Sequence, residues 1–446
     1  MGKVNAQVLA SYFHVRGCGG VTSRFPGNRS AFKELSKADR RQAFELFQFT
    51  KSIKVKSWRD TLNMLSAMQQ RGPAPDVYVY SATISKCGQS LHWQVSLEVF
   101  GEMIRGSILP NTVTYNAAIS ACEKGQQWQC ALGFLMEMSS ARVTADTISF
   151  NAAISAYEKG HQWQGAISLL GYMIYSSKVP DTISYNAAIS ACEKGHRSTK
   201  AVQLFETMSD VSISPCIITY NATISALGQG RQWQGALGLF CDMVCTRIAP
   251  NTITYNAVIS AFEKGQQWKG ALAVLGEVRP AGAVLDTISY NAAISACEKG
   301  HEWQISLALF DEMVQASIVP DTISCNSTIS ACGNGSQWQS ALSLLTNMVL
   351  FAIPADAITY NVSIDACVQA QRWQAALSLF GGMLCDSIAP NIFTYGASIS
   401  ACEEGNHSQG SLNLLFKMGK TRIAPDTCLY NSAIRIACEP PYLPTE

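Results

Sequence analysis

The sequence predicts an all-α protein, an α-solenoid superhelix of about eleven helix-turn-helix repeats of 35 residues. Two observations predict this fold: all nine tryptophans share one 35-residue spacing, and an Asp or Asn recurs with the same spacing. The tryptophans are Trp58, Trp93, Trp128, Trp163, Trp233, Trp268, Trp303, Trp338 and Trp373. Ser198 and Ser408 occupy the two missing places. Because repeats of this kind pack only on their neighbours, the array is expected to form one elongated body.

Each repeat ends at the recurrent Asp or Asn, which is numbered place 35. This closing residue is Asp76, Asn111, Asp146, Asp181, Asn251, Asp286, Asp321, Asp356, Asn391 or Asp426, with Cys216 as the exception. Ten complete repeats therefore span residues 77–426 without insertion or deletion. Residues 42–76 form a degenerate capping repeat, and residues 427–446 form a partial repeat and tail. Residues 1–41 form a basic N-terminal segment.

Each repeat is predicted to fold as two helices, shown most clearly by residues 287–321. Asp286 is a good N-cap for the first helix, and Gly300 is predicted to end that helix as its C-cap. The apolar face of the first helix comprises Tyr290, Ile294 and Cys297. The apolar face of the second helix comprises Trp303, Leu307, Phe310 and Met313. Neither helix can bury its apolar face alone, whereas stacked pairs can.

The composition, with 48% hydrophobic residues and a formal net charge of +1, is typical of a soluble globular chain. No apolar stretch is long enough to predict a membrane span. Cysteine recurs at place 11, as Cys87, Cys122, Cys192, Cys297, Cys332, Cys367 and Cys402. Tyr157, Leu227 and Phe262 fill that place elsewhere, which indicates a buried apolar position and reduced thiols. No cysteine or histidine spacing is typical of a metal site, so neither metal nor cofactor is expected.

The 35-residue period, the recurring Asp-Thr-Ile-Ser-Tyr-Asn, the mid-repeat Gly and the closing Pro-Asp resemble the pentatricopeptide repeat family. Tetratricopeptide and ankyrin arrays have periods of 34 and 33 residues. The resemblance covers residues 42–426. It implies sequence-selective binding of single-stranded RNA, with one base read per repeat by two or three side chains.

Place 5 of the repeat is the first candidate for base reading. It is Asn in Asn116, Asn151, Asn186, Asn221, Asn256, Asn291, Asn326, Asn361 and Asn431, whereas Ser81 and Gly396 depart from the pattern. Asn is a mediocre helix former, so its recurrence inside a first helix needs a reason. One reason is an amide that presents a donor and an acceptor to a base edge; the other is a ladder of Asn hydrogen bonds between repeats. The resemblance favours the first.

The closing residue is a helix cap on its own merits, and the resemblance makes it the partner of place 5 in base reading. It implies that Asn with Asp favours uracil, Asn with Asn favours cytosine, and Ser with Asn favours adenine. The expected adenine, uracil and cytosine pairs are Ser81 with Asn111, Asn116 with Asp146, Asn151 with Asp181, Asn221 with Asn251, Asn256 with Asp286, Asn291 with Asp321, Asn326 with Asp356, and Asn361 with Asn391. Asn186 with Cys216 and Gly396 with Asp426 give no clear base. The implied target is the pyrimidine-rich 5′-AUUNCUUUCN-3′.

Two further rows of residues are candidates for RNA contact. Place 2 is apolar, as Tyr78, Val113, Ile148, Ile183, Ile218, Ile253, Ile288, Ile323, Ile358 and Phe393. The resemblance places these side chains between successive bases; packing on the next repeat is the alternative. Place 13 carries Lys124, Lys159, Lys194, Lys264 and Lys299. The resemblance makes these lysines phosphate contacts, whereas a solvated, dipole-matched helix C-terminus is the alternative.

An enzymatic activity is not expected. The H-x-E and P-C-x-x-C motifs of a deaminase are absent, and four of the six histidines fall in turns between helices. Residues 1–33 contain no Asp or Glu and resemble a transit peptide for a mitochondrion or plastid, with a disordered basic arm as the alternative. Otherwise the protein is expected in the cytoplasm. The rival functions are a scaffold that binds a protein partner and a subunit that recruits a separate RNA-processing enzyme.

Overall fold

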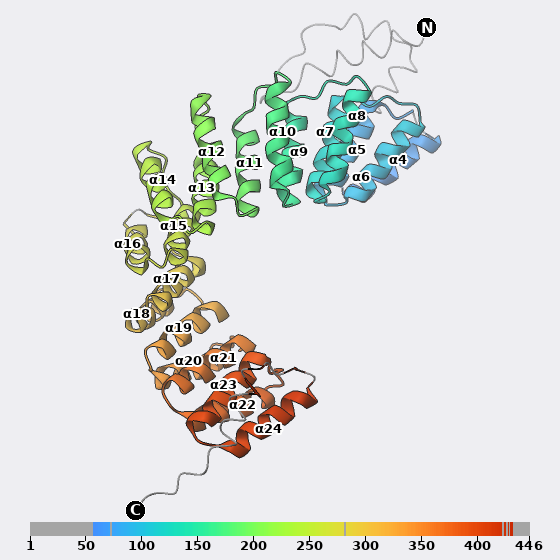
Figure 1. Cartoon of the computed structure of the whole chain (residues 1–446). Coiled ribbons are helices and arrows are strands. Elements are labelled where there is room, and N and C mark those ends of the chain that lie inside the picture. The colour runs from blue at the N-terminus through green and yellow to red at the C-terminus, as the bar shows by residue number, and fades with distance from the viewer. Residues whose placement is uncertain are drawn as a thin grey trace, which may run out of the picture. The chain divides into compact units, whose positions relative to one another are not determined.

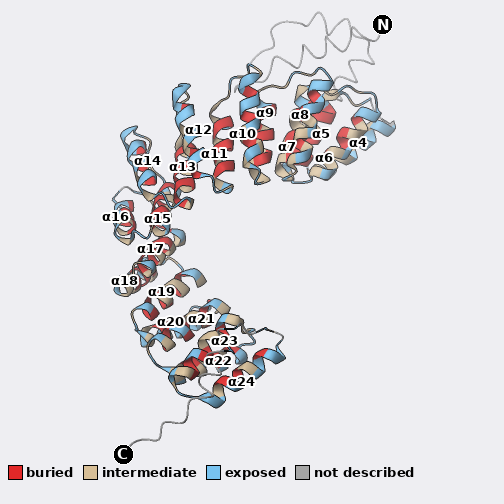
Figure 2. Cartoon of the chain, in the orientation of Figure 1, coloured by how far each residue is buried: buried red, intermediate tan, exposed pale blue. Residues whose placement is uncertain are grey.

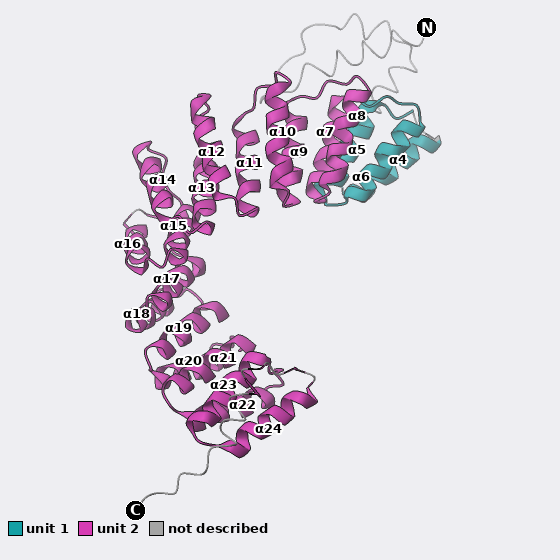
Figure 3. Cartoon of the chain, in the orientation of Figure 1, with its two compact units in different colours: residues 1–110 teal, residues 111–446 magenta. Residues whose placement is uncertain are grey.

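A computed structural model describes residues 57–71, 74–280, 282–421, 423–424, 427 and 429–430. The basic segment 1–41, the degenerate repeat before Ser57, the closing residue Asp426 and most of the C-terminal tail lie outside these residues. The chain divides into two compact units, residues 1–110 and residues 111–446 (Figure 3). Each compact unit is described by itself.

All regular secondary structure in the described residues is helical, which confirms the predicted all-α solenoid of helix pairs (Figure 1). The first compact unit contains α4 (Trp58–Arg71), α5 (Val77–Gln89) and α6 (Trp93–Arg105). The first helices of the repeats in the second compact unit are α7 (Thr112–Lys124), α9 (Thr147–Lys159), α11 (Thr182–Lys194), α13 (Ile217–Gln229), α15 (Thr252–Lys264), α17 (Thr287–Lys299), α19 (Thr322–Asn334), α21 (Ala357–Gln369) and α23 (Ile392–Glu404). The second helices are α8 (Trp128–Ser140), α10 (Trp163–Tyr175), α12 (Ser198–Asp210), α14 (Trp233–Cys245), α16 (Trp268–Val278), α18 (Trp303–Gln315), α20 (Trp338–Leu350), α22 (Trp373–Cys385) and α24 (Ser408–Lys420).

The first helices lie at the centre of the stack. In the second compact unit each first helix packs on the first helices of adjacent repeats, and each second helix packs on the first helix of its own repeat and of the next. The core follows the predicted faces, because Tyr290, Ile294, Cys297 and Met313 are all fully buried (Figure 2). The place-11 cysteines are fully buried as well, and burial raises the pKa of Cys297 to about 11. Among the described residues, no helix has the length and apolarity to cross a membrane.

In the turn after each first helix, the left-handed backbone conformation falls on the residue after the predicted C-cap glycine. Gly300 is the C-cap of α17 as expected, but its φ of −84° is open to any residue. The left-handed residue is the next one, His301, with a φ of 58°. The His301 N–H donates to the Glu298 carbonyl, and the Glu302 N–H donates to the Cys297 carbonyl, at 3.1 and 2.9 Å. These two bonds form a Schellman motif that tolerates a non-glycine residue in the left-handed position.

At six described joints the mid-repeat glycine leaves room for the tryptophan of the preceding repeat, whereas Ala370 stands at this place after Trp338. A Cβ atom at Gly160 would stand 2.5 Å from the Trp128 ring, and one at Gly195 would stand 2.5 Å from the Trp163 ring. Glycine and tryptophan meet in the same way at Gly265, Gly300, Gly335 and Gly405, which face Trp233, Trp268, Trp303 and Trp373. These six tryptophans therefore pack across the joint between two repeats, away from the place-5 asparagines. The tryptophans fix the spacing of the stack.

Candidate nucleic-acid interface

Places 2, 5, 9, 12 and 13 follow one another at helical spacing along one face of every first helix. We call this surface the first-helix face. The closing residue of the repeat reaches the same face, because it is the N-cap of the next first helix. In α17, for example, the Asp286 Oδ1 atom accepts a hydrogen bond of 2.9 Å from the Ser289 backbone N–H. Where the closing residue is Asp, the cap places a carboxylate at the start of the first helix, where the helix dipole favours negative charge.

The structure brings together the predicted pairs of place 5 and place 35. The amide Nδ2 atoms of Asn116, Asn151, Asn256 and Asn291 lie 3.0–3.1 Å from Oδ1 of Asp146, Asp181, Asp286 and Asp321, respectively. Longer contacts of 3.3–3.4 Å join Asn186 to Cys216, Asn221 to Asn251, Asn326 to Asp356, and Asn361 to Asn391. In each pair one amide N–H is used, so the second N–H of the Asn remains able to donate.

The asparagine carbonyl oxygen forms a ladder with the following repeat, the alternative role considered for place 5. The Ser289 hydroxyl donates to Asn256 Oδ1 at 2.6 Å, and the Thr254 hydroxyl donates to Asn221 Oδ1 at 2.7 Å. Equivalent bonds join Ser149 to Asn116, Ser184 to Asn151, Thr219 to Asn186, Ser324 to Asn291, and Thr394 to Asn361. The ladder fixes the plane of these seven amides, so that the free N–H has a defined direction. Asn326 is outside the ladder, because its Oδ1 atom has no hydrogen-bond partner among the described residues.

The hydroxyl donors of this ladder were not identified from the sequence. They stand at place 3 as Ser149, Ser184, Thr219, Thr254, Ser289, Ser324 and Thr394, and Thr114 and Thr359 occupy the same place of their repeats. All of them are buried. The signal that could have found them is the alternation of only Ser and Thr at one place of nine successive repeats. A fully buried hydroxyl needs a fixed partner, and only the side chains at places 5 and 35 are close enough to supply one.

Hydrogen bonds keep the closing carboxylates ionised. Burial acts to raise the pKa of Asp146, but bonds from the Ser149 backbone, the Asn116 amide and the Ser149 hydroxyl outweigh it, so the pKa falls below its ordinary value. The same balance lowers the pKa of Asp181 and Asp356. Oδ1 takes the bonds of the cap. Oδ2 of Asp181, Asp286 and Asp321 also accepts from the paired Asn amide at 3.0–3.2 Å, and its second lone pair remains able to accept a hydrogen bond from a ligand.

We call the side-chain atom at place 35 that does not cap the helix the outer atom, which is Oδ2 in an aspartate. Two kinds of repeat differ from the Asp repeats in this atom. Asn251 also caps its helix through Oδ1, which accepts from the Thr254 N–H at 3.0 Å, so its outer group is an NH₂ donor. Cys216 has only one side-chain polar atom, the Sγ, which lies 3.4 Å from both Asn186 Nδ2 and Thr219 Oγ1. Its repeat therefore has no outer atom at place 35. Ser81 is also distinct, since its buried hydroxyl donates to the Val77 carbonyl.

The apolar side chains at place 2 point into solvent. Val113, Ile148, Ile183, Ile218, Ile253, Ile288, Ile323 and Ile358 have relative exposures of 58–64%. Tyr78 and Phe393 are exposed as well. Place 2 precedes place 5 by one helical turn, so an exposed aliphatic group stands beside each Asn pair. A regular row of exposed isoleucines on a folded chain marks a surface that a ligand covers.

The lysines at place 13 divide into two groups. Lys159, Lys194 and Lys299 form ion pairs of 2.7–2.9 Å with Glu123, Glu158 and Glu263 of the preceding repeat. Lys124 and Lys264 form no ion pair within the described residues; the preceding repeats have Gly88 and Gly228 in place of the glutamate. In the first group the ammonium forms a contact between repeats, and its predicted contact with phosphate stays a prediction.

The described residues contain no group of three or more His, Cys, Asp and Glu side chains that could hold a metal ion. The site therefore consists of amide, carboxylate and aliphatic groups repeated along the first-helix face. This arrangement can donate and accept hydrogen bonds at regular intervals and can pack on flat rings. Asp426, which completes the last predicted pair with Gly396, and Asn431, the place-5 residue of the partial repeat, lie outside the described residues.

Comparison with solved structures finds the same fold in plant proteins. The pentatricopeptide repeat protein PPR10 from maize matches with a TM-score of 0.55 and 18% identity, over 90% of this chain and 66% of that chain. PPR10 in complex with an 18-nt psaJ RNA element matches with a TM-score of 0.40 and 20% identity, over 91% of this chain and 60% of that one. This chain thus spans slightly less than two thirds of the PPR10 chain. At these identities the likeness concerns the fold alone. No curated protein matches the sequence significantly.

Family models match the sequence in successive segments. The model described as the pentatricopeptide repeat domain matches residues 63–125, 98–160, 176–230 and 273–335. The model of the PPR repeat family matches residues 215–264 and 355–404, and that of the PPR repeat matches residues 148–177 and 253–279. Together these segments cover well over half of the chain, in the register of the helix pairs described above. The chain belongs to the pentatricopeptide repeat family.

Proposed function

We propose that the protein binds single-stranded RNA along the first-helix face and reads one base per repeat. The observation that carries this proposal is the row of paired polar side chains at places 5 and 35, each beside an exposed aliphatic group at place 2. A row of this kind offers each base an edge to bond and a surface to stack on. Solved structures of PPR10 and of yeast Rmd9p contain RNA, which is consistent with this ligand class.

The outer atom at place 35 supplies the discrimination between the pyrimidines. Uracil presents an N3–H donor between two carbonyl acceptors, so it complements the Asp321 Oδ2 acceptor beside the free Asn291 N–H. Cytosine presents an N3 acceptor instead, which complements the NH₂ donor of Asn251 beside the Asn221 N–H. In both cases the cap fixes which atom faces outward. This chemistry agrees with the assignment of uracil to Asn–Asp pairs and of cytosine to Asn–Asn pairs.

The proposed target is therefore 5′-AUUNCUUUCN-3′, read in the direction of the chain. A site of this kind would act by occupying a segment of a transcript in organellar RNA processing, stability or translation. The ion pairs at place 13 reduce the number of lysines that are available for phosphates, so base contacts carry much of the affinity. The basic segment 1–41, on which a mitochondrial or plastid location rests, lies outside the described residues.

The test is a binding titration with three nucleic acids: the target RNA, an RNA in which each pyrimidine is replaced by a purine, and DNA of the target sequence. We expect the target RNA to bind most tightly. Equal affinity for all three would remove base reading, and binding to none would favour a protein-binding scaffold.

A second test changes one reader. By the family pattern, Asn291→Thr moves one position of the preferred target from uracil toward guanine. An unchanged preference at that position would reject place 5 as a reader, even if the protein binds RNA.

A further inference from the structure

At most joints of the stack an indole ring fills the space between one second helix and the next repeat. The ring of Trp128 stacks on Tyr157, with 5.3 Å between centroids, and that of Trp233 lies 5.5 Å from Phe262. The guanidinium of Arg197 lies 5.1 Å from the centre of the Trp163 ring. Tyr157 and Phe262 stand at place 11, and Arg197 at place 16, of the following repeat. These two places therefore border the indole position.

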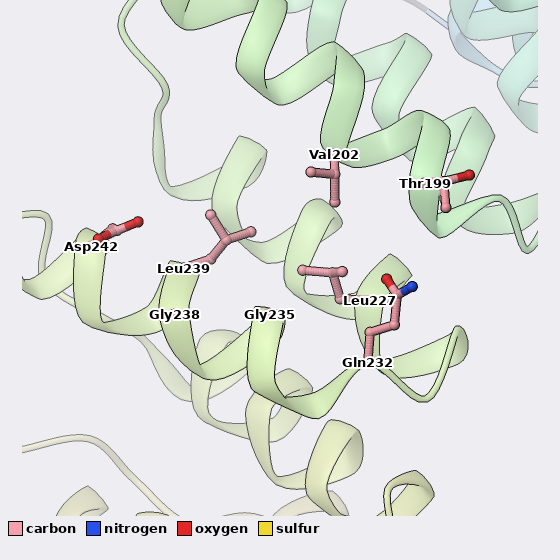
Figure 4. A pocket seen from close by; sticks show the side chains of 8 residues that line it. All are labelled: Thr199, Val202, Leu227, Gln232, Gly235, Gly238, Leu239 and Asp242. Atoms are coloured by element: carbon pink, nitrogen blue, oxygen red, sulfur yellow. The ribbon is translucent and has the colours of Figure 1, made fainter.

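The indole is missing where α12 begins with Ser198. A cavity of about 440 Å³ opens there, lined by Thr199, Val202, Leu227, Gln232, Gly235, Gly238, Leu239 and Asp242 (Figure 4). Leu227 and Gln232 occupy places 11 and 16, so the cavity borders the space in which the other joints hold a ring. Gly230 at place 14, the residue that elsewhere leaves room for the tryptophan, is retained, and a Cβ atom there would overlap the Ser198 side chain and lie 3.5 Å from the Leu227 carbonyl oxygen.

The walls of the cavity suit an aromatic ring attached to a peptide. Val202, Leu227 and Leu239 supply apolar surface from α12, α13 and α14. Gly235 and Gly238 stand one turn apart on α14, and a Cβ at Gly238 would meet nothing within 4 Å, so this side of the groove is bare backbone. Asp242 is exposed one further turn along α14 and places a negative charge at the rim.

We propose that this cavity binds the tryptophan side chain of a partner protein, with a basic residue next to that tryptophan facing Asp242. The chain itself shows the complementarity, because seven other joints of the second compact unit hold an indole in the equivalent position. The cavity is formed mainly by the second helices, whereas the RNA-binding site proposed above lies on the first helices. A partner bound there leaves the first-helix face open. The proposal does not depend on RNA binding.

The test uses N-acetyl-tryptophanamide, which presents the side chain on a blocked backbone, and measures binding to the full chain by ligand-observed NMR. We expect saturable binding to the wild-type protein. In Gly238→Leu the added side chain occupies the open groove. It should weaken binding by roughly tenfold or more, because the ring of the ligand then loses its apolar contact area in the groove. Gly133→Leu is the matched control: Gly133 has the same place in α8 and the same open surroundings, so binding should be unchanged.

A second variant tests the origin of the cavity. Ser198→Trp restores the indole in cis, so it should raise the Tm of the protein and abolish binding of N-acetyl-tryptophanamide. Equal binding by the wild-type and Gly238→Leu proteins would overturn the proposal, and so would equal binding of N-acetyl-leucinamide. For the rim charge, tryptamine should bind about threefold more tightly than indole to the wild-type protein and equally to Asp242→Asn. A threefold preference that survives in Asp242→Asn would reject the role given to that carboxylate.

Discussion

Replacing Cys216 with Asp should give its repeat a preference for uracil. The wild-type thiol offers one polar atom, which the Asn186 amide already contacts at 3.4 Å, so the repeat should bind uracil and cytosine about equally. An aspartate keeps that contact through Oδ1 and adds an outer oxygen that can accept from the uracil N3–H. A hydrogen bond to a charged group contributes about 1.5 kcal/mol or more, which corresponds to roughly a tenfold preference.

The assay is a competition titration with four RNAs that differ only at the fourth nucleotide of 5′-AUUNCUUUCN-3′. Cys216→Ser is the control, because a serine also caps the helix but adds no outer atom, and it should leave uracil and cytosine equal. If Cys216→Asp binds all four RNAs equally while the other positions stay selective, the outer atom at place 35 does not read the base. A tenfold uracil preference in the wild-type protein would refute the reasoning equally.

Three further predictions concern the joints, the charges and the caps. Gly300→Ala should lower the free energy of unfolding by about 1–3 kcal/mol, because the added methyl group overlaps the Trp268 ring. Gly276→Ala is the control: its methyl group meets open space, so the substitution should stabilise the protein slightly in thermal unfolding. A plot of the logarithm of RNA affinity against the logarithm of salt concentration should have a slope shallower than about −5. Glu263→Gln breaks the ion pair of Lys299 and should steepen that slope by about 0.7. An unchanged slope would show that Lys299 does not reach the phosphates. The folded-state pKa of Asp146, Asp181 and Asp356 lies below the ordinary 3.8, so the contribution of these three caps to stability is present above pH 3.8 and is lost as the pH falls through the folded value. A Tm that drops between pH 6 and about pH 5 would contradict this.

The sequence predicted the features that depend on one residue type recurring at one place. The helix pairs, the Asn and Asp caps and the buried cysteine row follow from spacing alone, because a fixed period puts equal residues in equal environments. The pairing of Asn291 with Asp321 is also of this kind. It needs only that the end of one repeat caps the next first helix.

The features that the sequence did not predict depend on contacts between different repeats. Gly300 was predicted as a C-cap, a position at which glycine commonly precedes or takes a left-handed backbone conformation. In the structure His301 has the left-handed conformation, and the missing side chain of Gly300 leaves room for the Trp268 ring. The sequence offered a phosphate contact or a solvated helix C-terminus for Lys299, and it did not show the ion pair with Glu263 of the repeat before it. Spacing within one repeat carries no information about which neighbour a side chain meets, so such roles appear only when the repeats are stacked.

The cross-joint position of the tryptophans has a consequence for how the array unfolds. In a linear stack the free energy of unfolding is a sum of intrinsic repeat energies and nearest-neighbour coupling energies, and the indole supplies a large part of each coupling. The joint at Ser198 lacks that part, so the coupling energy is reduced between the α11–α12 pair and the α13–α14 pair. Denaturation should then proceed as two blocks that separate at this joint. Because the same joint contains no tryptophan, intrinsic fluorescence would register each block melting but not the break between them.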